Sequence, residues 1–495
     1  MGVLARQAIS NTLLTYVGIA LGFINVVILY PRVLEADEFG LTRLLVSMAT
    51  MAAQIAQLGA ENTVVRFFPY FRDPARKHGG FLSMLLLFGL AVGLLAMLVL
   101  GIFHEQFARW FSDRNDLYER FGLLILPLVF GEIFFLLLRS YSRSLRRTVQ
   151  PVFLREFILR LLQTLLIMVQ ALAPMPFGVF MIIYVSLFLF CTIALVIDLW
   201  RNGHFRPGLD QWRLPGRLRR SMITYSTYTL SASLAGIVLG NIDQLMIGAL
   251  LGDGLRNVAV YAVAFYFGSV IAAPGRALYQ AALPMLADAW KRRDLKEIAD
   301  VYQRSSLVQT VIGGFLFLLM WMSLQDLFEL LPIDYAEGAG VAWVIGLAYV
   351  LNTSVGLNMG IISMSRSYRL DAWSSIGMLV INIVANFFLV RSMGIIGAAW
   401  STLLSLVLVN IFRTVYLYRK YGLWPFRIET LKVVGLVVLI GSIFPWIPLM
   451  GKALADIILR SVLIAFVYAG IGYLVGLFNE IGPFWMRYLR RNIGS

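Results

Sequence analysis

Charged side chains inside long apolar runs are the residues of this chain that could do chemistry. Arg66 and Arg276 each lie within such a run, and so do Glu61, Glu132 and Asp243. Ionisable groups are costly in hydrocarbon, so those that are retained there usually line the path of a substrate or an ion. An arginine stays charged and grips phosphate oxygens in pairs, whereas a buried carboxylate can bind and release a cation or a proton.

We expect Arg66 and Arg276 to form a cationic cavity that binds substrate. Asp243, Glu132 and Glu61 are the candidates for coupling to Na⁺ or H⁺. For each arginine the alternative is a pair with a nearby acid, or a position at the membrane interface. For Asp243 the alternative is a helix-packing ion pair between the two halves of the chain.

The composition gives little support to metal or nucleophile chemistry. Cys191 is the only cysteine, and the three histidines, His78, His104 and His204, lie far apart in the sequence. The chain can therefore form no internal disulfide and no Cys/His metal cluster, and it has no phosphate-cradling G-x-x-x-x-G-K-[ST] motif. We expect neither an enzyme nor a protein that carries a metal or an organic cofactor.

Membrane helices must position these charges. Of the 495 residues, 59% are hydrophobic and 14% are charged, against roughly 25% charged residues in a soluble domain. A span needs about 20 mostly apolar residues. About fourteen runs qualify, at residues 8–30, 41–67, 80–103, 119–141, 152–174, 177–200, 221–250, 258–287, 304–331, 339–364, 370–391, 395–418, 431–450 and 455–478.

The distribution of basic residues predicts how the chain is threaded through the membrane. The formal net charge is +15, and most of the Lys and Arg residues fall in alternate connections between the runs. This positive-inside pattern places both termini in the cytoplasm. The same basic loops can meet the anionic headgroups of membrane lipids, and no nucleic-acid partner is expected.

A repeated motif divides the runs into two sets. Ser140–Arg146 and Ser363–Arg369 share the pattern S-x-S-R-S-x-R, each at the end of an apolar run. The copies lie six runs apart, and an even offset places both on the same side of the membrane. We predict two parallel six-helix bundles related by a pseudo-twofold axis, plus two C-terminal helices. The predicted parts are an N-terminal half (1–200), a cytoplasmic linker (201–220), a C-terminal half (221–420), and two additional helices with a basic tail (421–495).

Several short sequences keep the order and spacing found in one known family. They are Leu29-Tyr-Pro-Arg-Val-Leu34, Glu38-Phe-Gly40, Leu58–Arg66, Asn241–Gly248, Val260–Ala264 and Gly394–Trp400. Together with the pattern of runs, they make the chain resemble the bacterial polysaccharide and O-antigen flippases (Wzx-type) of the multidrug/oligosaccharidyl-lipid/polysaccharide exporter superfamily. In this resemblance Arg66 matches the arginine that closes the second span, and Asp243 matches the acid of the seventh. Gln244 stands where the family usually has an acid or an arginine.

The resemblance implies a flippase of the bacterial cytoplasmic (inner) membrane. It would move an oligosaccharide linked to undecaprenyl diphosphate by alternating access, for the synthesis of lipopolysaccharide or a related polysaccharide. Contact with the polysaccharide polymerase machinery is also implied. Arg66 and Arg276 would bind the diphosphate or acidic sugars. Arg143 and Arg366, one from each motif copy, would capture the diphosphate first at the cytoplasmic mouth or anchor helix ends to lipid headgroups.

Two alternatives remain open. A cation-coupled multidrug antiporter of the same superfamily would need acids in its cavity and fewer arginines. A membrane-embedded polymerase or acyltransferase would need a large outer loop or a concentrated set of His and Asp residues, and neither is visible in the sequence.

Overall fold

The regular structure of the described chain is helical throughout. The computed structural model describes residues 3–71, 73, 77–111, 116–205, 207–208, 216–443, 451–474 and 476, and no strand occurs among them. Contacts divide the chain into an N-terminal unit, residues 6–259, and a C-terminal unit, residues 260–495 with Met1–Ala5. Part of the predicted linker (206 and 209–215) and the predicted basic tail (477–495) lie outside the described residues.

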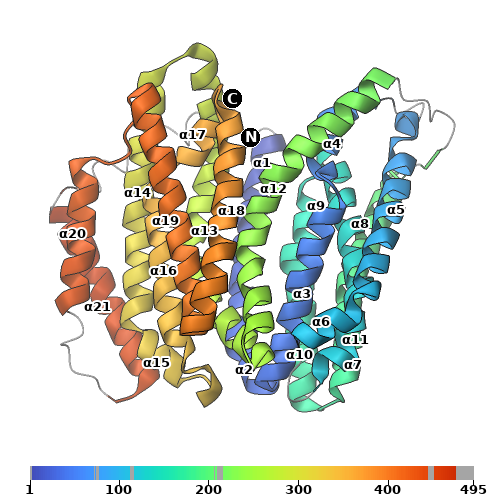
Figure 1. Cartoon of the computed structure of the whole chain (residues 1–495). Helices are drawn as coiled ribbons and strands as arrows, with labels where there is room; N and C mark the ends of the chain where they lie inside the picture. Colours follow the sequence, from blue (N-terminus) through green and yellow to red (C-terminus); the bar gives the residue numbers. More distant parts are fainter. Residues whose placement is uncertain are drawn as a thin grey trace. The chain divides into compact units, whose positions relative to one another are not determined.

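The N-terminal unit is a helical bundle, coloured blue to green in Figure 1. Its helix α8 packs against α3, α4, α5 and α11, and α12 packs against α3 and α4. The elements are α1 (Val3–Phe23), the π-helix η1 (Ile24–Leu29), α2 (Tyr30–Val33), α3 (Ala36–Ala56), α4 (Ala60–Phe67), the 3₁₀ turns η2 (Phe68–Phe71) and η3 (Lys77–Gly80), α5 (Phe81–Ile102), α6 (His104–Trp110), α7 (Leu117–Phe121), η4 (Gly122–Leu124), α8 (Ile125–Ser144), α9 (Val149–Val152), the π-helix η5 (Phe153–Ile158), α10 (Leu159–Leu172), α11 (Phe177–Arg201) and α12 (Gly216–Leu250).

A break separates α3 from α4 inside the run predicted as one span at 41–67. Leu58 (φ 52°) and Gly59 (φ 77°) adopt left-handed backbone there. Ser226 Oγ of α12 donates to Leu58 O at 2.5 Å. Thr229 Oγ1, one turn further along α12, donates to Gly59 O at 3.3 Å. Two hydroxyls of α12 therefore contact the backbone at the break, next to the start of α4.

The C-terminal unit is a second helical bundle, yellow to red in Figure 1, in which α18 and α19 lie side by side. Helix α16 packs against α14 and α19, and α14 also packs against α20 and α21. The elements are α13 (Gly254–Arg292), whose first turns belong to the N-terminal unit, α14 (Leu295–Met322), α15 (Leu324–Glu329), η6 (Ile333–Tyr335), α16 (Gly338–Ser354), α17 (Asn358–Met364), α18 (Tyr368–Met393), α19 (Ile395–Tyr421), α20 (Ile428–Ile443) and α21 (Ala453–Leu474).

Local signals in the sequence set several helix ends of this unit. Asp294 begins α14 by accepting a hydrogen bond from Glu297 N at 2.9 Å. Gly422 (φ 68°) ends α19 in the left-handed conformation that glycine adopts without strain. Gly356 (φ 69°) lies between α16 and α17, which are bent by 47° relative to each other. The bend brings the second motif copy, at the end of α17, against α18 and α19.

Long apolar helices confirm that this is an all-α, multi-pass membrane protein. Within the described residues, 10 helices are long and apolar enough to cross a membrane, or 11 if the bent pair α16–α17 is one span. The predicted count of fourteen is not confirmed. The predicted span at 152–174 is helical without a break from Val149 to Leu172, through α9, η5 and α10, but Arg155, Glu156 and Arg160 make it more polar than the other candidates. The predicted pseudo-twofold relation and domain limits stay predictions.

Candidate functional site: charged clusters within the two units

Glu61 and Arg143, predicted for separate roles, lie together in the N-terminal unit. Glu61 is in the first turn of α4, two residues after the break, and Arg143 is in the last turn of α8. Arg139 Nη2 donates to Glu61 Oε1 at 2.8 Å, and Arg143 Nη1 donates to the same oxygen at 3.3 Å. Arg139, which sequence reasoning did not single out, thus completes a cluster of two cations around one carboxylate.

Arg66, the predicted cavity arginine, is exposed on α4. Its guanidinium lies over the ring of Tyr225 on α12, 4.2 Å from the ring centroid, and 5.8 Å from that of Phe67. An aromatic face attracts the cation without using its N–H groups, so the donors can still serve a ligand. The helix α4 therefore presents an acid to α8 and an arginine to α12.

Glu132 is buried on α8 and forms a bidentate ion pair with Arg155 of η5. Both of its carboxylate oxygens accept from Arg155 Nη2 at 2.7 Å. The guanidinium also lies near the rings of Phe135 and Phe188, at 5.3 and 5.0 Å from their centroids. This ion pair neutralises the carboxylate and joins α8 to η5. The position of Glu132 therefore suits a role in helix packing.

Asp243 is fully buried on α12. Its neighbour Gln244 accepts a hydrogen bond from Ser47 Oγ of α3 at 2.7 Å, and this bond is buried as well. The polar stretch of α12 therefore packs against α3 inside the N-terminal unit. The role of Asp243 in ion coupling stays a prediction.

Arg276 and Arg366, the predicted arginines of the C-terminal unit, are both exposed. Arg276 follows Pro274 in α13, and its Nη2 lies 3.5 Å from Ser269 O. Arg366 lies in the short connection between α17 and α18. Both guanidinium groups are therefore accessible on this unit, in contrast to the buried arginine described next.

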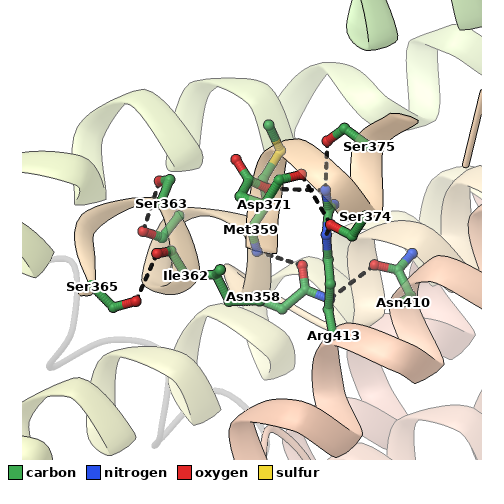
Figure 2. Close-up of polar contacts among 11 residues, drawn as sticks. Asn358, Met359, Ile362, Ser363, Ser365, Asp371, Ser374, Ser375, Asn410 and Arg413 are labelled. Atoms are coloured by element: carbon green, nitrogen blue, oxygen red, sulfur yellow. Dashed lines mark hydrogen bonds and ion pairs between the residues drawn. The ribbon is translucent and has the colours of Figure 1, made fainter. Parts of the chain in front are cut away.

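An ion pair that sequence reasoning missed lies between α18 and α19 (Figure 2). Arg413 Nη2 donates to Asp371 Oδ1 at 2.9 Å and to Ser375 Oγ at 2.8 Å, while its Nε donates to Ser374 Oγ at 2.9 Å. The side chains of Arg413 and Asp371 are only 6% and 11% exposed. The signal was present in the sequence, because Arg413 interrupts the apolar run 395–418.

One turn before Arg413, a chain of amides joins α19 to α17 and α16. Asn410 Oδ1 accepts from Asn358 Nδ2 at 2.9 Å, and Asn410 Nδ2 donates to Asn352 Oδ1 at 2.9 Å. Asn358 also accepts from Met359 N at the start of α17. The amides satisfy polar groups around the bend between α16 and α17, as buried polar groups must be satisfied in a membrane.

The second motif copy forms its own polar cluster. Ser367 Oγ lies 2.8 Å from Lys420 Nζ, 2.7 Å from the hydroxyl of Tyr416 and 3.1 Å from that of Tyr421. Lys420 and both tyrosines belong to the last turns of α19. The cluster ties the start of α18 to the end of α19. Elsewhere, among the described residues, no three His, Cys, Asp or Glu side chains gather as a metal site would require.

Comparison with known protein families places the chain. Residues 29–331, more than half of its length, match the family model of polysaccharide biosynthesis proteins. The chain belongs to this family. No curated protein matches the chain in sequence. The resemblance to polysaccharide flippases that the sequence motifs carried is thus confirmed at the level of the family.

Solved structures share the fold. The lipid II flippase MurJ, in an inward closed conformation, superposes with a TM-score of 0.72 at 10% identity, over 94% of this chain and 99% of that one. A multidrug resistance MATE transporter in an inward-facing conformation gives a TM-score of 0.57 at 14% identity, over 88% and 96% of the two chains. An outward-facing MATE transporter gives 0.55 at 10% identity, over 88% and 97%. The fold is therefore that of MurJ and the MATE transporters.

Proposed function

We propose that the protein moves a lipid-linked oligosaccharide, carried on undecaprenyl diphosphate, between the leaflets of the bacterial cytoplasmic membrane. The observation that carries the proposal is membership of the polysaccharide biosynthesis family on a fold shared with a lipid II flippase. A diphosphate with a sugar chain cannot cross hydrocarbon unaided, since its charges and hydroxyls would lose their water. A transporter that alternates its opening between the two sides supplies a polar path.

Exposed arginines support the binding of the diphosphate. Arg66 rests on an aromatic ring and keeps its N–H donors available, and Arg276 is exposed on α13. Guanidinium groups of this kind donate pairs of hydrogen bonds to phosphate oxygens. Arg143 and Arg366 would meet the substrate first, at the predicted cytoplasmic mouth.

The experiment is a leaflet-flipping assay with purified protein in vesicles that contain the lipid-linked oligosaccharide. We expect Arg66→Ala with Arg276→Ala to abolish transfer. The matched control is Arg391→Ala. Like Arg66, Arg391 lies over an aromatic ring, that of Phe387 with its centroid at 3.9 Å, and it belongs to the last turn of α18. Full activity of the double variant would reject the cationic site, and failure of the wild type to flip the substrate would reject the function.

A cation-coupled multidrug antiporter is the second candidate, because the fold is also that of MATE transporters. Such a protein needs carboxylates that can exchange cations. Glu132 is held by Arg155, and Glu61 by two arginines. Asp243, the buried acid of α12, is the residue that we would test. Efflux of a cationic dye from the same vesicles, lost in Asp243→Asn, would favour the antiporter. If flipping depends on a Na⁺ or H⁺ gradient and Asp243→Asn removes that dependence, Asp243 couples the ion in a flippase.

The proposed setting is the inner membrane, with both termini in the cytoplasm and with the polymerase machinery as a neighbour. Cys191 is the only cysteine and is buried, so a Cys191→Ser chain offers a background without reactive thiols. A single cysteine placed at either terminus should react with a membrane-impermeant reagent only after the cells are opened. Crosslinking from the same positions would test the polymerase contact.

A further inference from the structure

Two arginines of α8 share a single oxygen of Glu61. Arg139 Nη2 lies 2.8 Å and Arg143 Nη1 3.3 Å from Glu61 Oε1. The arginines are four residues apart, so they project from the same face of the helix. A single anionic oxygen that accepts from two guanidinium groups is an arrangement that phosphate oxygens also adopt. The carboxylate thus occupies a place that suits a phosphate.

The charge and exposure of this cluster leave room for a stronger anion. Two cations face one carboxylate, so the cluster keeps an excess positive charge. The side chains of Arg143, Arg139 and Glu61 are 45%, 33% and 14% exposed, and exposed ion pairs contribute little to stability. Arg139 Nε is buried and has no hydrogen-bond partner within the described residues. The cluster is therefore accessible at its two arginines and short of an acceptor at Arg139 Nε.

Glu61 and the two arginines of the cluster stand on different helices. Glu61 follows the left-handed residues Leu58 and Gly59 and lies in the first turn of α4, a helix of only 8 residues. The arginines belong to α8, a helix of 20 residues that is buried along much of its length. Because the acid and the arginines lie on different helices, rotation of the Glu61 side chain would move the carboxylate while the arginines stay in place.

We infer that Arg139 and Arg143 bind the diphosphate of the lipid carrier, and that Glu61 is the resident anion which the diphosphate displaces. This inference rests on the proposed function and adds Arg139 and Glu61 to the first contact that Arg143 makes with the substrate. A diphosphate brings more charge and more oxygens than one carboxylate, so it outcompetes Glu61 and can also use Arg139 Nε. Glu61 keeps the arginines from binding weaker anions when the substrate is absent.

The test is the affinity of purified full-length protein in detergent for a short-chain polyprenyl diphosphate. Glu61→Gln removes the competing charge at nearly constant size, and we expect it to tighten binding about tenfold, while Arg139→Gln and Arg143→Gln each weaken binding about tenfold. Glu61→Asp, whose shorter side chain cannot reach both arginines, should tighten binding less and serves as the second variant if Glu61→Gln fails to fold. If Glu61 has only a structural role, Glu61→Gln will lower the thermal stability and leave the affinity for the diphosphate unchanged.

Asp198→Asn is the matched control, because Asp198 pairs with a single arginine, Arg147 at 3.2 Å, and otherwise accepts from the neutral Asn202 Nδ2 at 3.1 Å. It changes the net charge equally and should leave the affinity unchanged. Equal tightening by Asp198→Asn would overturn the inference, since bulk charge would then explain the gain. So would an equal gain for the anionic phospholipid phosphatidylglycerol, because the arginines would then be headgroup anchors. No binding of the polyprenyl diphosphate by the wild type would reject the proposed function itself, whereas binding that ignores all Glu61 and arginine variants rejects only this inference.

Discussion

The two copies of S-x-S-R-S-x-R have nearly the same sequence and different structures. In the first copy the three serines stay within or next to the last turns of α8 and return their hydroxyls to carbonyls of that same helix. Ser140 Oγ donates to Leu137 O at 2.7 Å, and Ser144 Oγ donates to Ser140 O at 2.9 Å. The arginine of this copy, Arg143, pairs with Glu61.

In the second copy the helix ends inside the motif. Ser365 is extended (φ −82°, ψ 173°) and ends α17, and its Oγ accepts from Ser367 N at 2.9 Å. Ser367 in turn contacts Lys420 and two tyrosines of α19. The arginine of this copy, Arg366, is exposed.

The neighbours in space account for the difference. The first copy faces α4, which supplies an acid, whereas the second faces the end of α19, which supplies a lysine and hydroxyls. In the C-terminal unit the nearest acid along the chain is Asp371, which follows the motif in the first turn of α18. It is buried and pairs with Arg413. One region thus holds a partly exposed cluster of two arginines and one acid, and the other a buried ion pair.

Removal of the buried carboxylate should have the largest effect on stability. Asp371→Ala leaves the guanidinium of Arg413 buried without its counter-ion, and we expect the free energy of unfolding to fall by about 3 kcal/mol. Denaturant unfolding of the purified protein in detergent measures this. The double variant Asp371→Ala, Arg413→Met should recover most of the loss. If Asp371→Ala cost no more than Glu61→Ala, burial would not separate the two regions.

The buried pair Glu132–Arg155 tests whether the contribution to stability follows burial or differs between the two units. Glu132→Gln should lower the free energy of unfolding by about 2 kcal/mol, less than Asp371→Ala because Arg155 keeps two aromatic rings. The same unfolding assay applies. Glu156→Gln is the control, since its pair with Arg160 at 2.8 Å is more exposed. Equal losses for the two variants would argue against an effect of burial.

The serines of the motif should differ between the copies. Ser367→Ala removes an oxygen that three groups from α19 contact, and it should cost about 1 kcal/mol in unfolding free energy. Ser144→Ala removes a bond within its own helix and should cost close to nothing, because such bonds compete with the helix. A larger loss for Ser144→Ala would reverse the comparison.

The partly exposed ion pairs of Glu61 with Arg139 and Arg143 should contribute least to the free energy of unfolding, and their contribution should depend on salt. Glu61→Ala should lower the free energy of unfolding by less than about 1 kcal/mol at low ionic strength. The difference from the wild type should shrink further near 1 M salt, where charges are screened beyond about 3 Å. Unfolding curves at both ionic strengths measure it. A large loss that salt does not alter would place Glu61 among the structural acids.

Much of the fold followed from the apolar runs, and its irregular points did not. The runs at 80–103, 177–200 and 395–418 correspond closely to α5, α11 and α19. The break at Leu58 and Gly59 was not predicted, because two residues with positive φ leave little trace in an otherwise apolar run. Ser226 of α12, which contacts the backbone there, lies far away in the sequence.

The candidate site was predicted in part. Glu61 and Arg143 were each singled out by their place in or beside an apolar run, but for different roles. The structure pairs them and adds Arg139. Asp371 and Arg413 were passed over, although an arginine within an apolar run was itself a signal.

The sequence by itself determined the class of protein, because 59% hydrophobic residues in runs of spanning length leave a membrane as the only solvent that suits them. It also marked some of the charges that membrane helices retain, such as Glu61 and Glu132, and passed over others, such as Arg413. Only the tertiary structure decided which charges neutralise each other. Partners such as Glu61 and Arg139 lie on different helices, and a helix rotated by one residue would present another side chain. The same motif therefore contributes an arginine to an ion pair with α4 in one unit and a serine that contacts the end of α19 in the other.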